Sequence, residues 1–459
     1  MAPAVDPARR IKKLRRQHLR VRPSTSHNLW DLTSSPSVFI LWGYRMSLLD
    51  QLSDEAVWNR FYEYKCSLAC PKQFTKELRF FIDEKRYLPI CEKIRSGQDF
   101  PLPEKAVISK MGSEKRRTVY SYPDDESTVL KLLTYLILRK YDGIFQKSLY
   151  SFRPGRTAKD AVKALLGKKL IEKKPDEEKQ ISSIFEMYAY KADIHDYFNS
   201  IPVESLLPIL RETLAEDEEL FDFLTSLLKE ENVRFRGQVI REKKGIMAGT
   251  PQSAFYANLF LKGLDEHFAE QGVIYARYSD DIILFAPTED EVRTHAAFIH
   301  SYLEKYDLSI NPSKENFYSP GEGFTFLGFS CKENIVDIAP ATVKKLKQKM
   351  KRKRDALKRW SDRNDVAKEK AAAAFIRIFN RKLLESPQDN ELSWSHWFFP
   401  VINTTDSLHA IDLYAQDCLR YLISGTHTKA RYNVTYEMLK KLGYRSLVNA
   451  YYKDEENVE

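Results

Sequence analysis

The chain has 459 residues, of which 43% are hydrophobic and 30% are charged, and it carries a net charge of +9. This length allows two or three domains with a substantial core, and the composition is typical of a soluble globular protein. No run of eighteen apolar residues occurs, so we expect no transmembrane helix and no membrane partner. The positive charge favours a polyanionic partner, whose class composition alone does not identify.

The first segment, residues 1–45, differs from the rest of the chain. It begins with a basic run at 9–16 and continues through a stretch rich in Ser, Thr and Pro. An amphipathic helical pattern starts at Met46. We therefore expect residues 1–45 to be a disordered basic extension, and we interpret them as a mis-called start with Met46 as the natural initiator. A basic arm that binds nucleic acid is the functional alternative.

Beyond residue 45 the pattern alternates between helices and short strands. The helices expected from apolar periodicity lie at 46–100, 127–141, 203–230, 252–271 and 289–306. The expected strands lie at 187–192, 233–242, 273–285 and 324–338, with further short strands between 105 and 165 and a charged surface loop before 187. Beyond Pro340 the chain reads as almost wholly helical. This order predicts an α+β fold followed by an all-α part.

The cysteines bear on the cellular compartment. They are scattered and form no Cys-x-x-Cys pair: Cys66, Cys70, Cys91, Cys331 and Cys418. An odd number without metal-ligand spacing predicts buried thiols in a reducing cytoplasm. We therefore expect a cytoplasmic protein.

Tyr278-Ser279-Asp280-Asp281 stands between two apolar runs, 273–276 and 282–285. Both runs have the β-branched and aromatic content of buried strands, so we predict a hairpin whose tight turn carries two adjacent carboxylates. Such carboxylates repel each other and lose hydration unless a positive charge lies between them. A pair of divalent metal ions is the usual source of that charge, which indicates chemistry on phosphates.

Asp193 is the candidate for a third carboxylate, because it ends the apolar strand predicted at 187–192. Two metal ions about 3.5–4 Å apart need carboxylates from separate elements, and Asp193, Asp280 and Asp281 would supply three. The ions would activate a primer hydroxyl and hold a nucleoside triphosphate. The structural alternative is that Asp193 caps a helix that begins near Tyr197.

The ordered motifs resemble those of reverse transcriptases, most closely the bacterial enzymes related to group II intron and retron proteins. Asp193 and Ile194 match the first catalytic carboxylate and its following apolar residue, and residues 278–281 match the Tyr-x-Asp-Asp turn. The resemblance implies that Asp193, Asp280 and Asp281 are catalytic. With Ile194 they would bind two Mg²⁺ ions, for which Mn²⁺ could substitute. It also implies a right-hand polymerase, with fingers and an antiparallel palm over 46–335 and a helical thumb or RNA-binding domain over 336–459.

Further matches concern the incoming nucleotide. Arg116 and Arg117 lie in a basic segment that resembles the fingers strand holding the triphosphate. Phe198 matches the aromatic gate beneath the sugar, which implies a preference for dNTPs; ordinary core packing is the alternative for this ring. Lys314 matches the lysine that approaches the leaving pyrophosphate. Gly249 belongs to a glycine-rich segment, 245–258, that resembles the one contacting template and nucleotide.

The resemblance also implies contacts with template and primer. They involve Arg153 in a Phe-Arg-Pro-Gly-Arg segment, two residues of the glycine-rich segment, and the primer grip at 324–329; the residues are Arg153, Thr250, Pro251, Phe326, Leu327 and Gly328. Relatives commonly have Pro-Gln where this chain has Met247-Ala248, so one side-chain contact to the nucleotide is missing.

The segment 344–370 contains thirteen Lys or Arg and four acidic residues. We predict a helix that follows the phosphates of a template–primer duplex. A solvated helix face is the alternative.

The subgroup is inferred from the Met-Ala-Gly-Thr-Pro form at 247–251 and from residues 443–448. These look most like bacterial reverse transcriptases of phage defence and abortive infection, and the signatures of mobile-intron and retron enzymes are missing. The resemblance implies an RNA-directed DNA polymerase with a structured noncoding RNA as template, dNTPs as substrates and DNA as product. It leaves the oligomeric state and a second protein subunit open. The alternatives are a terminal transferase or RNA polymerase on the same palm, and an idle RNA-binding scaffold.

Overall fold

The computed structural model describes residues 47–68, 72–109, 116–167, 183–385 and 394–455. The expectations for residues 1–45, for Cys70 and for most of the charged loop before the strand predicted at 187–192 lie outside these residues.

The first part of the described chain is helical and leads into two strands. Its elements are η3 (Asp50–Ser53), α2 (Glu55–Ser67), α3 (Lys72–Asp83), α4 (Leu88–Arg95), β1 (Glu104–Ser109), β2 (Arg116–Ser121), α5 (Asp124–Lys140), η4 (Asp142–Ile144) and α6 (Ala158–Leu166). Helix α5 begins at Asp124, three residues before the predicted start. Three acidic residues occupy its first turn, where they interact favourably with the helix dipole.

The central part alternates strands and helices as predicted. Its elements are η5 (Ile184–Glu186), β3 (Tyr188–Asp193), α7 (Tyr197–Ser200), α8 (Val203–Thr213), α9 (Glu218–Lys229), β4 (Asn232–Phe235), β5 (Gln238–Arg241), α10 (Ser253–Phe260), α11 (Lys262–Glu270), β6 (Ile274–Tyr278), β7 (Asp281–Ala286), α12 (Glu289–Glu304), η6 (Pro312–Lys314) and β8 (Asn316–Tyr318).

The prediction of one helix over 252–271 is wrong, because two helices meet at Leu261. The backbone of Leu261 departs from helical geometry, with φ −99° and ψ 14°. Helix α10 is buried on nearly every side, whereas α11 buries only one face.

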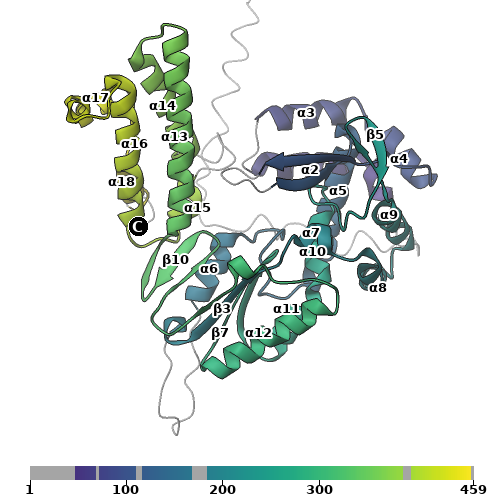
Figure 1. Cartoon of the computed structure of the whole chain (residues 1–459). Coiled ribbons are helices and arrows are strands. Elements are labelled where there is room, and N and C mark those ends of the chain that lie inside the picture. The colour runs from purple at the N-terminus through teal and green to yellow at the C-terminus, as the bar shows by residue number, and fades with distance from the viewer. Residues whose placement is uncertain (1–46, 69–71, 110–115, 168–182, 386–393, 456–459) are drawn as a thin grey trace, which may run out of the picture. The chain divides into compact units, whose positions relative to one another are not determined.

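The palm sheet has the strand order β6-β7-β3-β8, and all its pairs are antiparallel. Helix α12 contacts β3 and β7, while α11 and α6 contact β6 (Figure 1). The fingers sheet has the order β2-β1-β4-β5, in which only the β1–β4 pair is parallel. The antiparallel palm predicted from the sequence is confirmed.

The C-terminal part begins with a small sheet of order β11-β10-β9 and continues as helices. Its elements are β9 (Phe324–Phe326), β10 (Phe329–Lys332), β11 (Ile335–Ile338), α13 (Pro340–Arg363), α14 (Lys368–Leu383), α15 (Trp394–Phe398), α16 (Asp406–Ser424), η7 (Lys429–Asn433), α17 (Tyr436–Lys441) and α18 (Leu447–Glu455). The predicted right-hand polymerase fold with a helical C-terminal region is confirmed.

The prediction of a single helix over the basic segment 344–370 is wrong, because the segment belongs to two helices. Helix α13 ends at Arg363 and α14 begins at Lys368. Between them Asp365 has a φ of 46°, a left-handed conformation that ends a helix. The two helices pack against each other and against α16.

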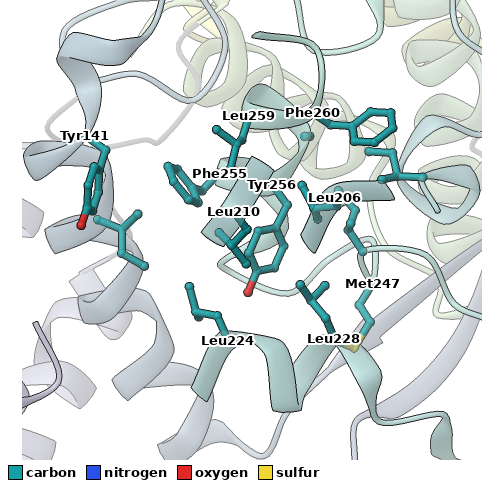
Figure 2. Packing of buried hydrophobic residues seen from close by; sticks show 14 of the residues in the cluster. Tyr141, Leu206, Leu210, Leu224, Leu228, Met247, Phe255, Tyr256, Leu259 and Phe260 are labelled. Atoms are coloured by element: carbon teal, nitrogen blue, oxygen red, sulfur yellow. The ribbon is translucent and has the colours of Figure 1, made fainter. Parts of the chain in front are cut away.

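Buried apolar side chains form two clusters. The first joins the N-terminal helices to α8, α9, α10 and one side of the palm sheet. Figure 2 shows part of it, where Leu206 and Leu210 of α8 and Leu224 and Leu228 of α9 surround Tyr256 of α10. The second cluster joins the other side of the palm sheet to β9–β11 and the C-terminal helices. The palm sheet is therefore held from both faces, which makes its strand ends a rigid platform.

Three of the described cysteines are buried as predicted, and one is not. Burial raises the pKa of the Cys91 thiol to about 11 and those of Cys331 and Cys418 to about 12, so these thiols are inert. The prediction is wrong for Cys66, which is exposed because the buried stripe of α2 ends at Phe61. No helix among the described residues is long and apolar enough to cross a bilayer.

Candidate active site

The predicted hairpin is present, with the acidic turn at its tip. Tyr278 of β6 pairs with Asp281 of β7, which leaves Ser279 and Asp280 as a two-residue turn. Such turns favour a positive φ, and Ser279 has a φ of 61°. This conformation is uncommon for a residue other than glycine, so surrounding contacts must hold it.

Strand β3 brings the third carboxylate to the same place. Asp193 is the register partner of Asp281 in the β3–β7 ladder. One residue further on, the Ile194 N–H donates a hydrogen bond to the Asp280 carbonyl over 3.1 Å. Asp193, Asp280 and Asp281 therefore meet at one end of the palm sheet, as the sequence predicted.

The capping alternative for Asp193 is wrong. The residue before α7 is Asp196, and no side chain caps that helix. Asp193 is instead 5% exposed, and its Oδ2 forms an ion pair with the ammonium group of Lys314. Its carbonyl accepts a 2.8 Å hydrogen bond from the Asn311 N–H, which ties η6 to the end of β3.

The electrostatics of the turn are those of crowded anions. Burial, together with Asp280 and Asp193, raises the pKa of Asp281 to about 6, and Lys191 and Lys314 only partly oppose this. Burial and then Asp193 also raise the pKa of Asp280. Lys191 is itself desolvated, which lowers its pKa. Ionising all three carboxylates therefore calls for more positive charge than the neighbouring lysines supply.

The donor set suits a hard divalent cation, because carboxylate and carbonyl oxygens are the ligands that Mg²⁺ prefers. Asp193, Asp280, Asp281 and the carbonyl of Ile194 are the groups that would hold it. Within the described ranges, however, no three acidic, His or Cys side chains already converge on one point. The ion pair of Asp193 with Lys314 gives a physical reason, since the ammonium group occupies one carboxylate.

An aromatic group lies beside the turn. The rings of Phe152 and Phe198 meet edge to face with centroids 6.3 Å apart, and Phe152 also lies 6.5 Å from the ring of Tyr278. Phe198 is half-buried and packs against the first apolar cluster. Its carbonyl accepts a 2.9 Å hydrogen bond from the Ile246 N–H, and a Cβ on Gly245 would lie 2.5 Å from the same oxygen. The glycine-rich segment is thus packed directly against the predicted gate.

The glycine-rich segment also contacts the fingers sheet. The Tyr120 N–H of β2 donates to the Ala248 carbonyl over 2.8 Å, and Gly249 has a φ of 106°. A Cβ on Gly249 would lie 2.9 Å from the Tyr120 carbonyl, so only glycine fits here without displacement. The hydroxyl of the buried Thr250 donates to the Met247 carbonyl over 3.0 Å, and Pro251 is partly exposed. The backbone of this segment is fixed by its own contacts.

The predicted basic contacts fall into two groups. Arg116 and Arg117 are exposed on β2, where they are accessible to an anion. Arg153 is buried, and its guanidinium donates to both carboxylate oxygens of Asp142 and to the carbonyls of Gln146 and Asp142. The structure gives Arg153 a structural role, and its predicted contact with nucleic acid stays a prediction.

The predicted primer grip lies at the β9–β10 turn. Phe326 is buried in the second apolar cluster, while Leu327 and Gly328 form the turn with positive φ values of 49° and 91°. The Gly328 carbonyl accepts a 2.8 Å hydrogen bond from the Ala339 N–H at the start of α13. The turn is thus fixed to the first C-terminal helix, and contact with a primer stays a prediction.

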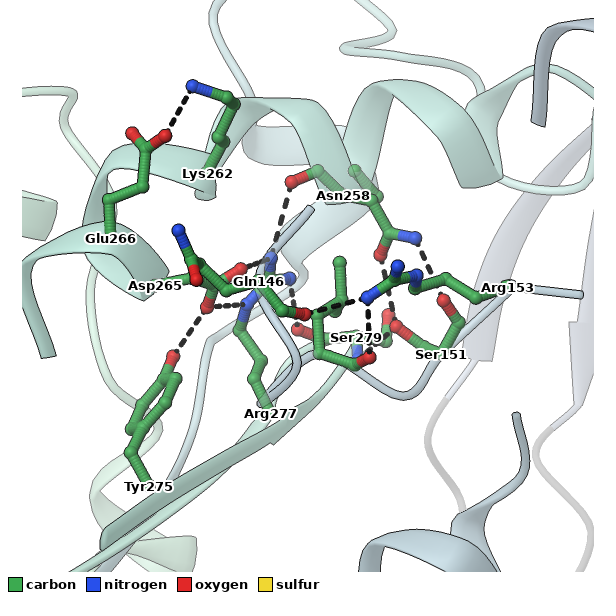
Figure 3. A network of polar contacts seen from close by, with 12 residues as sticks. Gln146, Ser151, Arg153, Asn258, Lys262, Asp265, Glu266, Tyr275, Arg277 and Ser279 are labelled. Atoms are coloured by element: carbon green, nitrogen blue, oxygen red, sulfur yellow. Dashed lines mark hydrogen bonds and ion pairs between the residues drawn. The ribbon is translucent and has the colours of Figure 1, made fainter. Parts of the chain in front are cut away.

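The sequence reading missed a group of buried polar residues behind the turn, centred on Arg277 (Figure 3). Arg277 interrupts the apolar run of β6, and that interruption was a usable signal: a charged residue in a buried strand needs a partner. Its partner, Asp265, lies on helix α11.

Residues 108–331 match the family described as "Reverse transcriptase (RNA-dependent DNA polymerase)". No curated protein matched the chain in sequence.

Among solved structures, those similar to the chain include three telomerases. The apo telomerase of Candida tropicalis truncated from the C-terminal domain is 12% identical with a TM-score of 0.39, and the match covers 52% of this chain and 55% of that one. The apo telomerase of the same species is 12% identical with a TM-score of 0.41, covering 74% and 68%. The Candida albicans telomerase in complex with a TWJ fragment of telomeric RNA is 10% identical with a TM-score of 0.38, covering 80% and 71%.

The family match begins near the end of β1 and includes β2, β4 and β5 of the fingers sheet and the whole palm sheet with its acidic turn. Residues 108–331, slightly less than half of the chain, are therefore similar to a reverse transcriptase domain.

Proposed function

We propose that the chain is an RNA-directed DNA polymerase that joins deoxynucleotides by a two-metal mechanism. The observation that carries this proposal is the register of the palm sheet, which sets Asp193 opposite Asp281 and beside Asp280. One buried and two part-buried carboxylates that repel one another destabilise a fold unless they serve a cation site.

The residues have distinct parts in this chemistry. Asp193, Asp280 and Asp281, with the Ile194 carbonyl, would hold two Mg²⁺ ions, which acidify the primer hydroxyl and neutralise charge on the phosphates. Lys314 forms an ion pair with Asp193, and its half-exposed side chain would be positioned to contact the departing pyrophosphate. Arg116 and Arg117 present exposed guanidinium groups for the triphosphate.

Selection of the sugar is assigned to Phe198. The ring is half-buried and is braced by Phe152 at 6.3 Å and by Tyr197 at 5.8 Å, both edge to face. A braced ring cannot retreat from a 2′-hydroxyl without disturbing its neighbours, so ribonucleotides are disfavoured. The backbone of Gly245 and Ile246 contacts the Phe198 carbonyl, which fixes the backbone that carries the ring.

The biological setting is proposed from the sequence motifs at 247–251 and 443–448, which resemble those of bacterial enzymes in phage defence. The template would be a structured noncoding RNA, and the duplex would be followed by the basic face of α13. The exposed Lys344, Lys345 and Lys351 on that helix support phosphate contacts, which carry little sequence information.

Polymerase assays test the activity. The purified chain should incorporate dNTPs on an added RNA template in the presence of Mg²⁺, and NTPs much more slowly. Asp280→Asn with Asp281→Asn should abolish incorporation. Preference for NTPs, or incorporation that ignores the template, would instead indicate an RNA polymerase or a terminal transferase.

The cellular role has a separate test. Phage infection of a host expressing the wild-type chain or the Asp280→Asn/Asp281→Asn variant should show protection only for the wild type. Sequencing of the nucleic acid that copurifies with the wild type should recover the noncoding RNA and complementary DNA. Protection by the double variant would indicate a scaffold that acts through RNA binding alone.

A further inference from the structure

A group of buried polar side chains lies directly behind the acidic turn (Figure 3). Its members are Ser151, Asn258, Asp265 and Arg277, and each is 1% exposed or less. They come from the loop before α6, from α10, from α11 and from β6. None of these side chains is a predicted ligand of metal, nucleotide or nucleic acid, so the polymerase chemistry leaves them without a role.

The centre of the group is the ion pair of Arg277 with Asp265. The Arg277 Nε donates to Asp265 Oδ1 over 2.7 Å, and Nη2 donates to Oδ2 over 2.5 Å. The Tyr275 hydroxyl adds a third hydrogen bond to Oδ1 over 2.9 Å. The remaining guanidinium donors reach the Ser279 carbonyl through Nη1 and the Asn258 carbonyl through Nη2, each over 3.2 Å.

The second half of the group contacts the turn from its N–H side. The Ser279 N–H donates to the Ser151 hydroxyl over 2.8 Å, and that hydroxyl donates to Asn258 Oδ1 over 3.0 Å. Asn258 closes the ring with a 2.8 Å hydrogen bond from Nδ2 to the Ser151 carbonyl. Both backbone groups of Ser279 are therefore bound by buried side chains on opposite sides.

Ser279 is the residue that most needs such support. Its left-handed backbone is strained, and Asp280 and Asp281 follow it directly. The repulsion between those carboxylates favours relaxation of the turn. The two peptide groups that flank Ser279, one held at its N–H and the other at its carbonyl, cannot rotate without breaking buried hydrogen bonds.

We propose that Arg277, Asp265, Ser151 and Asn258 form a positioning frame that fixes the Ser279 backbone and thereby aims Asp280 and Asp281 at the metal ions. This inference rests on the proposed polymerase function, because that function requires metal ions at the turn. The positions of Asp280 and Asp281 can nevertheless be tested by metal binding alone. The frame residues touch neither substrate nor metal. They act through the turn.

The test uses the full-length chain with Ser151→Ala and Arg277→Lys. Ser151→Ala removes the acceptor of the Ser279 N–H and the donor to Asn258 Oδ1. Arg277→Lys keeps the positive charge but loses the planar guanidinium group that binds both oxygens of Asp265. Mn²⁺ binding, followed by electron paramagnetic resonance, gives a readout that needs no catalysis. For both variants we expect Mn²⁺ affinity to fall at least about fivefold. We also expect kcat to fall on the order of 10²-fold with little change in the KM for dNTP, as for a misplacement of about 1 Å.

Two controls separate positioning from general stability. Glu266→Gln lies next to Asp265 on α11 and removes only a part-exposed contact with Lys262 (Figure 3). Asp217→Asn alters another buried carboxylate, which accepts from the Ser47 hydroxyl and the Leu48 N–H far from the turn. Both should bind Mn²⁺ like the wild type, even if Asp217→Asn lowers the melting temperature as much as Ser151→Ala does.

The outcomes are distinct. If the Ser151→Ala and Arg277→Lys proteins fold and bind Mn²⁺ as tightly as the wild type, the four residues do not position the metal site and the proposal is wrong. Weaker Mn²⁺ binding by both variants supports it even if the wild type shows no polymerase activity, in which case the proposed function alone fails.

Discussion

Positive charge serves two different purposes in two regions of this chain. Behind the acidic turn, Arg277 is 0% exposed and every contact of its guanidinium is with Asp265 or with backbone carbonyls. Along α13, Lys344, Lys345 and Lys351 are exposed to solvent. The buried charge fixes one geometry, whereas the surface charges remain available to a polyanion.

The number of charges in a segment therefore does not indicate how much they contribute to the stability of the fold. A single buried pair is costly to break, because removal of one partner leaves the other without compensation. Surface lysines change stability little, yet their sum can dominate binding to nucleic acid.

The largest effect on stability is expected from Arg277→Met alone. It leaves Asp265 buried and charged, so the free energy of unfolding should fall by about 3–5 kcal/mol. Arg277→Met combined with Asp265→Leu should recover much of this loss, because an apolar pair carries no uncompensated charge. Urea unfolding of both variants measures the difference. Equal losses in the single and double variants would contradict an ion pair at the centre of the frame.

Removing one negative charge from the acidic turn should raise stability, in contrast to Arg277→Met. The pKa of Asp281 is raised to about 6, so its contribution to stability is present below about pH 4 and is lost as pH rises toward 6. Without divalent cations, Asp281→Asn should therefore melt higher than the wild type at pH 7.5, by on the order of a few °C. This advantage should shrink toward pH 4 and disappear in saturating Mg²⁺. If the wild type were more stable than Asp281→Asn at pH 7.5 in EDTA, repulsion between the carboxylates would not be what destabilises the turn.

Changes on α13 should affect binding and not folding. Lys344, Lys347 and Lys351 line one shallow groove together with Tyr414. Replacing all three with Gln should weaken binding to an RNA–DNA duplex and reduce the salt dependence of binding by about 0.9 in log–log slope for each lost phosphate contact. The free energy of unfolding should change by no more than about 0.5 kcal/mol per substitution. If the affinity for the duplex and its salt dependence do not change, these lysines form a solvated helix face that does not bind nucleic acid.

The smallest effect is expected from Glu266→Gln. Its ion pair with Lys262 joins two part-exposed side chains one turn apart on α11. Such pairs contribute less than about 1 kcal/mol, so urea unfolding should detect little change. A loss comparable to that of Arg277→Met would show that α11 is weakened as a whole rather than through Asp265.

The hairpin and the position of the three carboxylates at one end of the palm sheet were predictable from sequence. Apolar β-branched runs on both sides of residues 278–281 specify two buried strands, and the run before Asp193 specifies a third. Their short lengths leave few ways to pair, so the acidic residues meet at one end. The break at Leu261 was not predictable, because the apolar pattern of α10 and α11 continues through it.

The partners of individual charges were the part that sequence did not reveal. Lys314 and Arg153 both match basic motifs, yet the structure pairs Lys314 with Asp193 and Arg153 with Asp142. Arg277 stands out in its strand, but nothing local indicates that Asp265, twelve residues earlier on a helix, faces it. Such pairs depend on how a helix packs on a sheet, which periodicity does not specify.

The most direct test of the account is Mg²⁺-dependent extension of a primer on an RNA template, measured for the wild type and the Asp280→Asn/Asp281→Asn variant. The wild type should incorporate dNTPs in template order, and the folded double variant should incorporate none. Extension by the double variant at the wild-type rate would contradict the assignment of the acidic turn as the catalytic centre.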